Sequence, residues 1–233
     1  MTEQSYFIRA EGLTKQYRQG DAQLAVLDSL DFTVRAGEVV VVMGVSGTGK
    51  STLLNVLGGI DRAETGQLWV NGLDLMDCSD RQLTSYRRDN VGFIFQFYNL
   101  LPSLTAFENV LMGLEARNGS GGREGASRAM QLLSAAGLEG KEHKFPEQLS
   151  GGEQQRVAIA RAMIGSPPLI LADEPTGNLD HATGERILAL LVEQARNSNA
   201  TLILVSHNHD LAVLADRTLA LLDGRLSPIE GAP

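Results

Sequence analysis

The strongest constraint on the fold is a segment in which an apolar run leads directly into a glycine-rich loop and then a helix. The run Val39–Met43 is aliphatic on both faces, as a strand in the middle of a parallel sheet must be. The loop Gly44–Ser51 matches the pattern G-x-x-x-x-G-K-S, and Lys50–Leu57 continues as a helix. Glycines let a backbone wrap around an anion, and a helix N-terminus adds partial positive charge. The segment therefore predicts an α/β protein that binds phosphate at this loop.

The side chains of this loop predict a nucleoside triphosphate together with Mg²⁺. Lys50 is expected to reach the β- and γ-phosphates, and the Ser51 hydroxyl is expected to ligate Mg²⁺. The remaining nucleotide contacts expected here are Gly44, Ser46, Gly47, Thr48, Gly49 and Thr52.

Two acidic residues follow a second buried strand. The aliphatic run Leu169–Ala172 ends at Asp173 and Glu174, where ligands bind in open α/β sheets. Asp173 is expected to help hold Mg²⁺ through its water shell, and Glu174 to act as the general base that polarises the attacking water. Taken alone, an Asp-Glu pair after a strand is an ordinary loop or helix cap. Its combination with the phosphate loop favours the catalytic interpretation.

A second helix start of a kind that could bind phosphate lies about a hundred residues after the first. Ser150 is a good N-cap and Glu153 stands at N3, so a capping box alone would explain the pattern. Gly151 and Gly152, however, cost about 1 kcal/mol each in a helix unless a ligand must approach closely. One triphosphate needs only one such loop. The pair of helix starts therefore suggests that each nucleotide is held between two copies of the protein.

Composition limits the class of protein. A chain of 233 residues with 43% hydrophobic content can bury the core of one α/β domain, with or without an insertion. The net charge of −8 argues against binding nucleic acid or an anionic bilayer through the whole surface, although a local basic patch stays possible. The single cysteine, Cys78, excludes an internal disulfide and is expected to be a buried or incidental thiol.

No segment predicts export or membrane insertion. Met1–Tyr6 lacks the basic start and apolar run of a signal peptide. The longest apolar runs are far shorter than the ~20 residues that span a bilayer. Any contact with a membrane is therefore expected to come through a partner.

The rest of the chain predicts a helical segment inserted into the α/β core. Thr105–Glu108 reads as a capping box that opens a helix to about Arg117, and Arg123–Ala136 continues with Gly137 at C′. Asn118–Gly122 is expected to be a flexible loop. The helical segment covers approximately residues 97–165. Further strands are predicted at 32–34, 68–70, 91–95, 202–205 and 219–222.

With these features in place, the chain resembles the ATP-binding cassette (ABC) ATPases. Leu149–Arg156 is similar to the signature motif of that family, and the order of motifs from about Tyr6 to Arg225 follows it. The resemblance implies one ABC ATPase domain over residues 1–233. That domain would have a P-loop NTPase core with a mostly parallel sheet, an N-terminal antiparallel β subdomain and an inserted α-helical subdomain.

The resemblance also assigns roles that the residues alone leave open. It implies that Tyr17 stacks on adenine, although an exposed tyrosine could be plain surface. His207 resembles the switch histidine that contacts the γ-phosphate, although a lone histidine after a strand could be structural. His209 is a rival for this role, and His207 is preferred because it directly follows the predicted strand. Gln96 would sense Mg²⁺ and the γ-phosphate, and Asp180 would belong to the D-loop.

The family implies a head-to-tail dimer in which Ser150, Gly151 and Gly152 of one copy, with Glu153, close over the ATP bound by Lys50 of the other. Gln96–Pro102 and Asp173–Asp180 are most similar to the branch of lipoprotein-releasing and macrolide-exporting ATPases, the LolD/MacB/YbbA branch. Some members carry a membrane part behind the ATPase, whereas this sequence ends at Pro233 and resembles the stand-alone members.

The expected function is that of an ATPase subunit in a membrane complex, peripheral on the cytoplasmic side of the bacterial inner membrane. A transmembrane permease is expected to dock near Gln96–Leu104, on an apolar cluster that could instead be core: Phe97, Tyr98, Leu100, Leu101 and Leu104. Rival interpretations are a soluble ABC ATPase of DNA repair or translation and a P-loop kinase. The first would need a coiled-coil insertion or a second cassette, and a kinase gives no reason for the Ser150 motif.

Overall fold

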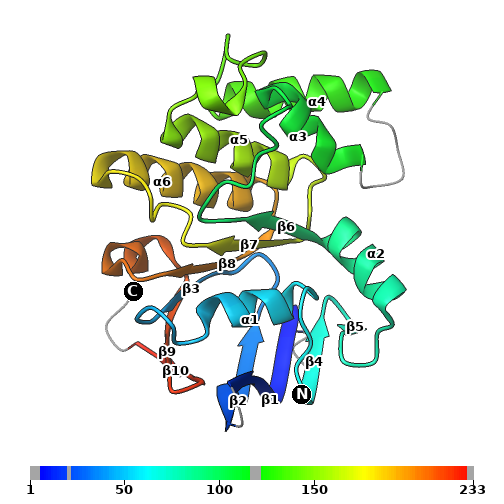
Figure 1. Ribbon diagram of the computed structural model, residues 1–233, viewed down its shortest axis with the longest axis vertical. Coiled ribbons are helices and arrows are strands. Elements are labelled where there is room, and N and C mark those ends of the chain that lie inside the picture. The colour runs from blue at the N-terminus through cyan, green and yellow to red at the C-terminus, as the bar shows by residue number, and fades with distance from the viewer. Residues whose placement is uncertain (1–5, 20–21, 116–121, 230–233) are drawn as a thin grey trace. The chain divides into compact units, whose positions relative to one another are not determined.

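The computed structural model describes residues 6–19, 22–115 and 122–229. The chain divides into two compact units, of which the first comprises residues 1–87 and 201–233 and the second residues 88–200. The colours of Figure 1 follow the chain through both units. Most of Met1–Tyr6, the predicted helix end near Arg117 and most of the predicted loop Asn118–Gly122 lie outside the described residues.

The first unit contains the predicted N-terminal antiparallel sheet, in the order β2-β1-β4-β5. Its strands are β1 (Ile8–Gln19), β2 (Ala22–Val34), β4 (Thr65–Val70) and β5 (Leu73–Asp74). Alternate residues of β1 such as Ile8 and Ala10 are buried, as expected for a sheet with one packed face. Register shifts between Ala10 and Gln16 interrupt this alternation. Because strands are predicted from this alternation, the register shifts explain why only residues 32–34 of the long β1–β2 pair were predicted as strand.

The same unit contains the strand that leads into the phosphate loop. In β3 (Val39–Met43) all residues are buried, and β3 pairs in parallel with β8 (Thr201–Ser206) and β9 (Arg217–Leu222). The edge strand β10 (Arg225–Pro228) is antiparallel to β9. Helix α1 (Lys50–Leu57) starts after the loop and contacts β2 and β8. The predicted α/β fold with a mostly parallel core is therefore confirmed.

Helix α2 (Asp80–Asn90) was not predicted, because its sequence is polar and only Leu83 and Tyr86 are buried. The Tyr86 hydroxyl donates a hydrogen bond to the Leu57 carbonyl oxygen at 2.8 Å, which ties α2 to the end of α1. Nearby, the Cys78 thiol is 4% exposed and donates to the Asp74 carbonyl oxygen at 3.1 Å. This cysteine is buried, as one of the two expectations had it.

The second unit pairs β6 (Val91–Ile94) in parallel with β7 (Leu169–Asp173), with most of its helices between them in the chain. The helices are α3 (Ala106–Glu115), α4 (Gly122–Ala135), the short η1 (Pro146–Gln148), α5 (Gly151–Met163) and α6 (His181–Asn197). Gly92 of β6 is needed for α5 to approach, since a Cβ there would lie 2.5 Å from the Ala162 carbonyl oxygen. This compact unit extends beyond the predicted limits 97–165.

Two predicted helix ends in this unit, the start at Thr105 and the ending at Gly137, are confirmed. The Thr105 backbone N–H and hydroxyl both donate to the Glu108 carboxylate, and the Glu108 N–H donates back to the Thr105 hydroxyl. Gly137 has φ +68°, and the Leu138 N–H donates to the Leu133 carbonyl oxygen at 2.9 Å, which is a Schellman ending. Across the ranges that the structure describes, no helix is both long and apolar enough to cross a bilayer.

Candidate nucleotide-binding site

The phosphate loop has the backbone that its glycines predict. Gly47 and Gly49 have φ of +85° and +99°, a region in which other residues are strained. A Cβ on Gly49 would also lie 2.6 Å from Val26 Cγ1 and 2.9 Å from the Val26 carbonyl oxygen. Gly49 is the N-cap of α1, where no side chain caps the helix and no acidic residue stands in the first turn. The first turn of α1 therefore keeps its positive character, which suits an anion.

Lys50 lies close against the loop and is only 5% exposed. Its ammonium donates to the carbonyl oxygens of Gly44 and Val45 at 2.8 and 3.0 Å. Because the chain holds Lys50 Nζ beside the loop backbone, the lysine is in place to pair with a phosphate that the loop binds. Ser46, Gly47 and Ser51 are exposed, with Ser51 in the first turn of α1.

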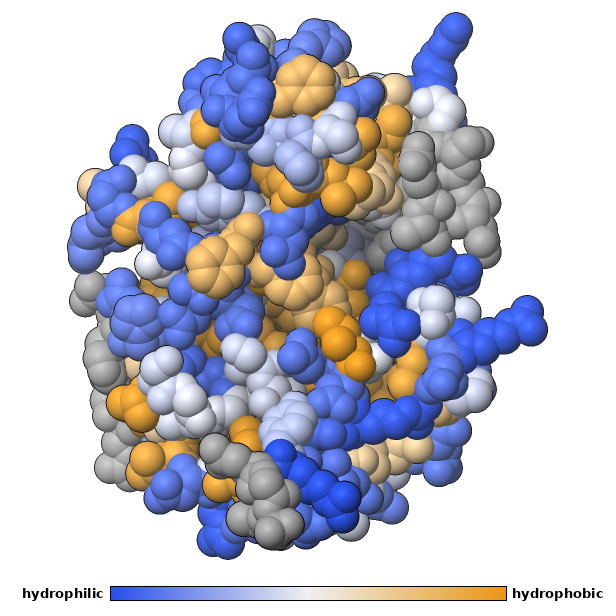
Figure 2. All heavy atoms as spheres, in the orientation of Figure 1, coloured by the Kyte–Doolittle hydropathy of each residue, from blue (hydrophilic) through white to orange (hydrophobic). Residues whose placement is uncertain are grey.

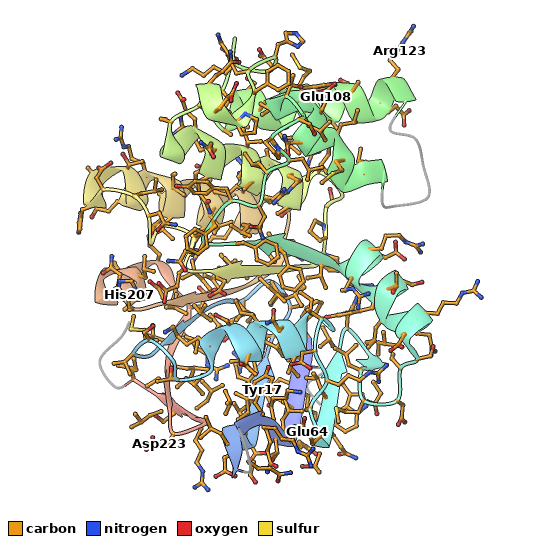
Figure 3. All side chains as sticks on the ribbon, in the orientation of Figure 1. Tyr17, Glu64, Glu108, Arg123, His207 and Asp223 are labelled. Atoms are coloured by element: carbon orange, nitrogen blue, oxygen red, sulfur yellow. The ribbon has the colours of Figure 1, made fainter. Side chains whose placement is uncertain are left out.

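Tyr17 and His207 belong to the same unit as the phosphate loop. The Tyr17 hydroxyl donates to Asp61 Oδ2 at 2.7 Å, and the Thr52 side chain in the first turn of α1 lies near enough to act on the pKa of that hydroxyl. The structure thus brings the predicted adenine-stacking residue to the phosphate-binding helix. His207 is exposed and follows β8 directly, whereas His209 begins the short helix η2 (His209–Leu214). Figure 3 labels both Tyr17 and His207.

In the second unit the structure brings Gln96 and Glu174 to the same turn. The Asn178 amide donates to the Gln96 carbonyl oxygen at 2.9 Å. A Cβ built on Gly177 would lie 3.0 Å from Gln96 Nε2 and 3.5 Å from Glu174 Oε2. The side chains of Gln96 and Glu174 therefore both lie beside this glycine. Glu174 has φ +41°, an unfavourable backbone for a glutamate that is often found at functional sites. Asp173 ends β7 immediately before it.

The second helix start carries its own cap. Ser150 is the N-cap of α5, its N–H donates to Glu153 Oε2 at 2.8 Å, and the Glu153 N–H donates to the Ser150 hydroxyl at 3.4 Å. Glu153 also forms an ion pair with Lys141. The hydrogen bond with Lys141, helped by the Ser150 N–H, lowers the pKa of Glu153 from 4.5 to about 2. The Glu153 carboxylate is thus already paired within its own chain.

The two glycines that follow have a structural reason. A Cβ on Gly151 would lie 2.9 Å from the Tyr98 hydroxyl oxygen, and one on Gly152 would lie 2.8 Å from Thr183 Cγ2 of α6. Neighbours within the chain thus give both glycines a structural reason, and the close approach of a nucleotide to them stays a prediction. Asp180, the predicted D-loop residue, is the N-cap of α6 and accepts from the Thr183 N–H at 3.0 Å.

Two residues that the sequence did not reveal, the half-buried Arg161 and the buried Asn109, hold the loop after Gln96. Arg161 of α5 donates to the carbonyl oxygens of Asn99 and Tyr98 at 2.5 and 2.8 Å. Asn109 of α3 is fully buried; its amide oxygen accepts from the Leu101 N–H, and its amide nitrogen donates to the Leu101 carbonyl oxygen. In the sequence, the only signal for these contacts was that Arg161 and Asn109 lie on helices of the same inserted segment as the loop. They fix a loop that has no helix of its own.

This fixed loop divides the predicted apolar cluster. Phe97 and Leu101 are 73% and 42% exposed, whereas Tyr98, Leu100 and Leu104 are half-buried. The core interpretation is therefore wrong for the first two residues. Figure 2 shows hydrophobic side chains gathered over the segment that leads from β6 into α3.

The donors available for a metal ion fit Mg²⁺ rather than a protein-made cage. Within the part of the chain that the structure describes, no three His, Cys, Asp or Glu side chains cluster as a metal site. Magnesium bound to a nucleotide needs only one or two protein ligands, with water and phosphate oxygens completing its shell. Ser51 in the first turn of α1 and Asp173 at the end of β7 each carry such an oxygen, and their role as Mg²⁺ ligands stays a prediction.

Comparison with known proteins identifies the family. The model of the ABC transporter family matches residues 27–177. The lipoprotein-releasing system ATP-binding protein LolD of Chromohalobacter salexigens is 48% identical over 94% of this chain and 92% of its own. The macrolide export ATP-binding/permease protein MacB of Rhodopirellula baltica is 44% identical over 93% of this chain, which corresponds to 32% of that protein.

A solved structure agrees. The dimeric, post-hydrolysis structure of the ATP-binding cassette MJ0796 with ADP and Pi has a TM-score of 0.87 and 40% sequence identity, and the match covers 96% of this chain and 99% of that one. The predicted resemblance is confirmed, and the chain belongs to the ABC transporter family as an ATP-binding cassette that hydrolyses ATP.

Proposed function

We propose that this ABC cassette, acting as one domain over residues 1–233, powers a membrane complex of the lipoprotein-release or macrolide-export type. The observation that carries the proposal is the phosphate loop, in which Lys50 is held against the loop and α1 starts without a side-chain cap. The similarity to LolD and to the fused ATPase and permease of MacB supports the type of complex. The chain would work peripherally, on the cytoplasmic side of the bacterial inner membrane.

ATP would bind with its phosphates on the loop. Its β- and γ-phosphates would pair with Lys50, while Ser51, Asp173 and Gln96 would hold Mg²⁺ directly or through water. Bound Mg²⁺ would neutralise charge on the phosphate oxygens. His207 would contact the γ-phosphate, and Glu174 would accept the proton of the attacking water.

Two copies would close around the nucleotides, as the dimeric structure of the similar MJ0796 cassette suggests. The Ser150 hydroxyl caps only the Glu153 N–H of this helix start. The N–H groups of Gly151 and Gly152 are therefore the donors proposed to bind the partner's ATP. Hydrolysis would remove this bridge and reopen the dimer.

The loop after Gln96 would receive the permease. Phe97 and Leu101 are its exposed apolar side chains, and Arg161 and Asn109 hold the backbone beneath them. A fixed loop with exposed anchors loses little conformational freedom on binding. Tyr98, whose hydroxyl oxygen packs against Gly151, is a poorer anchor than the sequence suggested.

Substitution of Glu174 tests the chemistry. Glu174→Gln should keep ATP binding, lower turnover by at least about a hundredfold, and accumulate dimers with ATP and Mg²⁺ in size-exclusion chromatography. Glu185→Gln, at an exposed position of α6, is the matched control and should change none of these quantities. Turnover within about threefold of wild type would remove Glu174 from the role of base.

Copurification tests the membrane partner. Phe97→Glu should keep the ATPase rate of the isolated chain and abolish copurification with the permease, because a charge would replace an apolar anchor. Phe145→Glu changes another exposed phenylalanine of the same unit and should leave the complex intact. Unchanged copurification of the Phe97 variant would place the docking surface elsewhere.

A further inference from the structure

A buried lysine lies beneath the predicted adenine-stacking residue. Lys15 is 7% exposed, and its ammonium donates to Asp61 Oδ1, Glu64 Oε1 and the Arg62 carbonyl oxygen at 3.0, 3.0 and 2.8 Å. Burial opposes the charged form, but the hydrogen bonds with Asp61 and Glu64 raise the pKa of Lys15 overall. Lys15 is therefore a permanent buried cation with every ammonium proton accounted for.

The same cation lies over the ring of Tyr17, two residues along β1. Lys15 Nζ is 4.9 Å from the centroid of the Tyr17 ring, within the range of a cation–π contact. Asp61 joins the two residues, because its Oδ1 accepts from Lys15 and its Oδ2 accepts from the Tyr17 hydroxyl. Yet Tyr17 is 40% exposed. The ring is thus fixed at its hydroxyl and has a cation over one face, while Tyr17 remains partly open to solvent.

The segment that supplies these carboxylates is itself tied to β1. The Gln16 N–H donates to Glu64 Oε2 at 2.7 Å, and the Glu64 N–H donates to the Thr14 carbonyl oxygen at 2.9 Å. Figure 3 labels Tyr17 and Glu64. The backbone on both sides of Lys15 therefore fixes the place of the acids that hold it.

We propose that Lys15 and Asp61 are positioning residues for the nucleotide base, acting through Tyr17. The inference rests on the proposed function in one respect, namely that Tyr17 stacks on adenine. A cation on one face of an aromatic ring draws π density towards itself, so the opposite face repels an electron-rich purine less. A ring already fixed by Asp61 also loses less freedom when the base binds.

A second cation–π pair on the same strand provides a matched control. Arg9 lies over the ring of Trp69, 5.2 Å from its centroid, and forms an exposed ion pair with Glu11. None of the hydrogen bonds described above connects it to Tyr17. Replacing Arg9 removes a cation–π contact from β1 without touching the proposed base platform.

The test measures steady-state ATP and CTP hydrolysis by the purified chain. Lys15→Met should raise KM for ATP about 3- to 5-fold, the effect expected for one cation–π contact, with kcat within about twofold of wild type. The ratio of kcat/KM for ATP to that for CTP should fall, because a purine overlaps the ring more than a pyrimidine does. Lys15→Arg should restore most of the ratio, and Arg9→Met should leave it unchanged.

A double-mutant cycle separates positioning from general stability. Tyr17→Ala should raise KM for ATP, and Lys15→Met should then add nothing in that background. Additive effects, or equal losses for ATP and CTP, would overturn the role of Lys15 while leaving Tyr17 as the stacking residue. A Tyr17→Ala variant with unchanged KM and unchanged ratio would instead overturn the adenine-stacking role itself.

A further variant covers the case in which Lys15→Met fails to fold because Asp61 and Glu64 are left unpaired. Tyr17→Phe keeps the ring and the lysine but removes the hydroxyl that Asp61 holds. It should raise KM for ATP about twofold and lower the ratio of ATP to CTP specificity. No change in either quantity would overturn the positioning role of Asp61.

Discussion

The two helix starts of this cassette both contain glycines but are capped differently. At α1 the N-cap is Gly49, no side chain caps the helix, and its first turn holds no acid. At α5 the N-cap is Ser150, which forms a capping box with Glu153, and Glu153 is paired with Lys141. At the start of α1 no side chain accepts from the first N–H groups, which leaves them for a ligand. At the start of α5 the Ser150 side chain accepts from one of these groups, the Glu153 N–H. A capped helix N-terminus therefore has fewer N–H groups left for a phosphate than an uncapped one.

The glycines of the two segments differ in the same way. Gly47 and Gly49 have positive φ and are required by the path of the backbone. Gly151 and Gly152 lie within helix α5, where a Cβ would instead meet side chains, the Tyr98 hydroxyl at Gly151 and Thr183 Cγ2 at Gly152. One set makes a loop possible and the other makes a packing contact possible.

The largest effect that tests this comparison is expected at Gly49. Gly49→Ala should destabilise the chain by about 3 kcal/mol or more, since a strained φ adds to a clash with the Val26 backbone, and it should abolish nucleotide binding. Gly47→Ala meets no atom within 4 Å and should cost only about 1–2 kcal/mol of backbone strain. Urea unfolding and fluorescent-nucleotide binding measure both effects. Equal losses at the two positions would mean that the Val26 contact carries no weight.

A substitution at Gly152 sharpens this comparison. The backbone of Gly152 is helical, so only the lack of space for a Cβ beside Thr183 opposes a larger residue. Gly152→Ala gains about 1 kcal/mol of helix propensity but loses about 1–3 kcal/mol to the contact with Thr183, for a net loss of about 1 kcal/mol. In a Thr183→Ser background the obstructing methyl is gone. The same substitution should then stabilise the chain. If urea unfolding shows that Gly152→Ala destabilises the chain in that background too, packing is not the reason for this glycine.

The smallest expected effect is electrostatic and depends on pH. Glu153→Gln keeps a residue able to complete the capping box but removes the ion pair with Lys141, a loss of up to about 1 kcal/mol near neutral pH. Because folding lowers the pKa of Glu153 from 4.5 to about 2, the carboxylate stabilises the fold fully above pH 4.5 and loses this effect as pH falls through 2. The stability difference between wild type and variant should shrink along that range. A difference independent of pH would show that the charge contributes nothing.

The parts of the fold that the sequence predicted are those with a strong local pattern. The aliphatic strand Val39–Met43, the capping box of Thr105 and Gly137 as a C′ residue are each set by residues next to one another. The long β1–β2 pair and the polar helix α2 were missed. Their bulges and polar composition hide the periodicity on which such predictions depend.

The site shows the same limit. Lys50 and the glycines of its loop could be identified because one short segment determines their geometry. Arg161 and Asn109, which hold the loop after Gln96, contact it across 62 and 8 residues of sequence, and no local pattern announces either. The reason for Gly152 could not be seen either, because Thr183 approaches only after α6 has packed.

The buried Cys78 gives the chain a built-in kinetic reporter. Its thiol lies in the first unit, is 4% exposed, and is the single cysteine of the sequence. A thiol reagent can reach it only when that unit opens, so the labelling rate reports the opening of the phosphate-loop unit while the signature-helix unit stays silent. Slower labelling in the presence of ATP would then give the protection that the nucleotide confers on one unit, without an engineered probe.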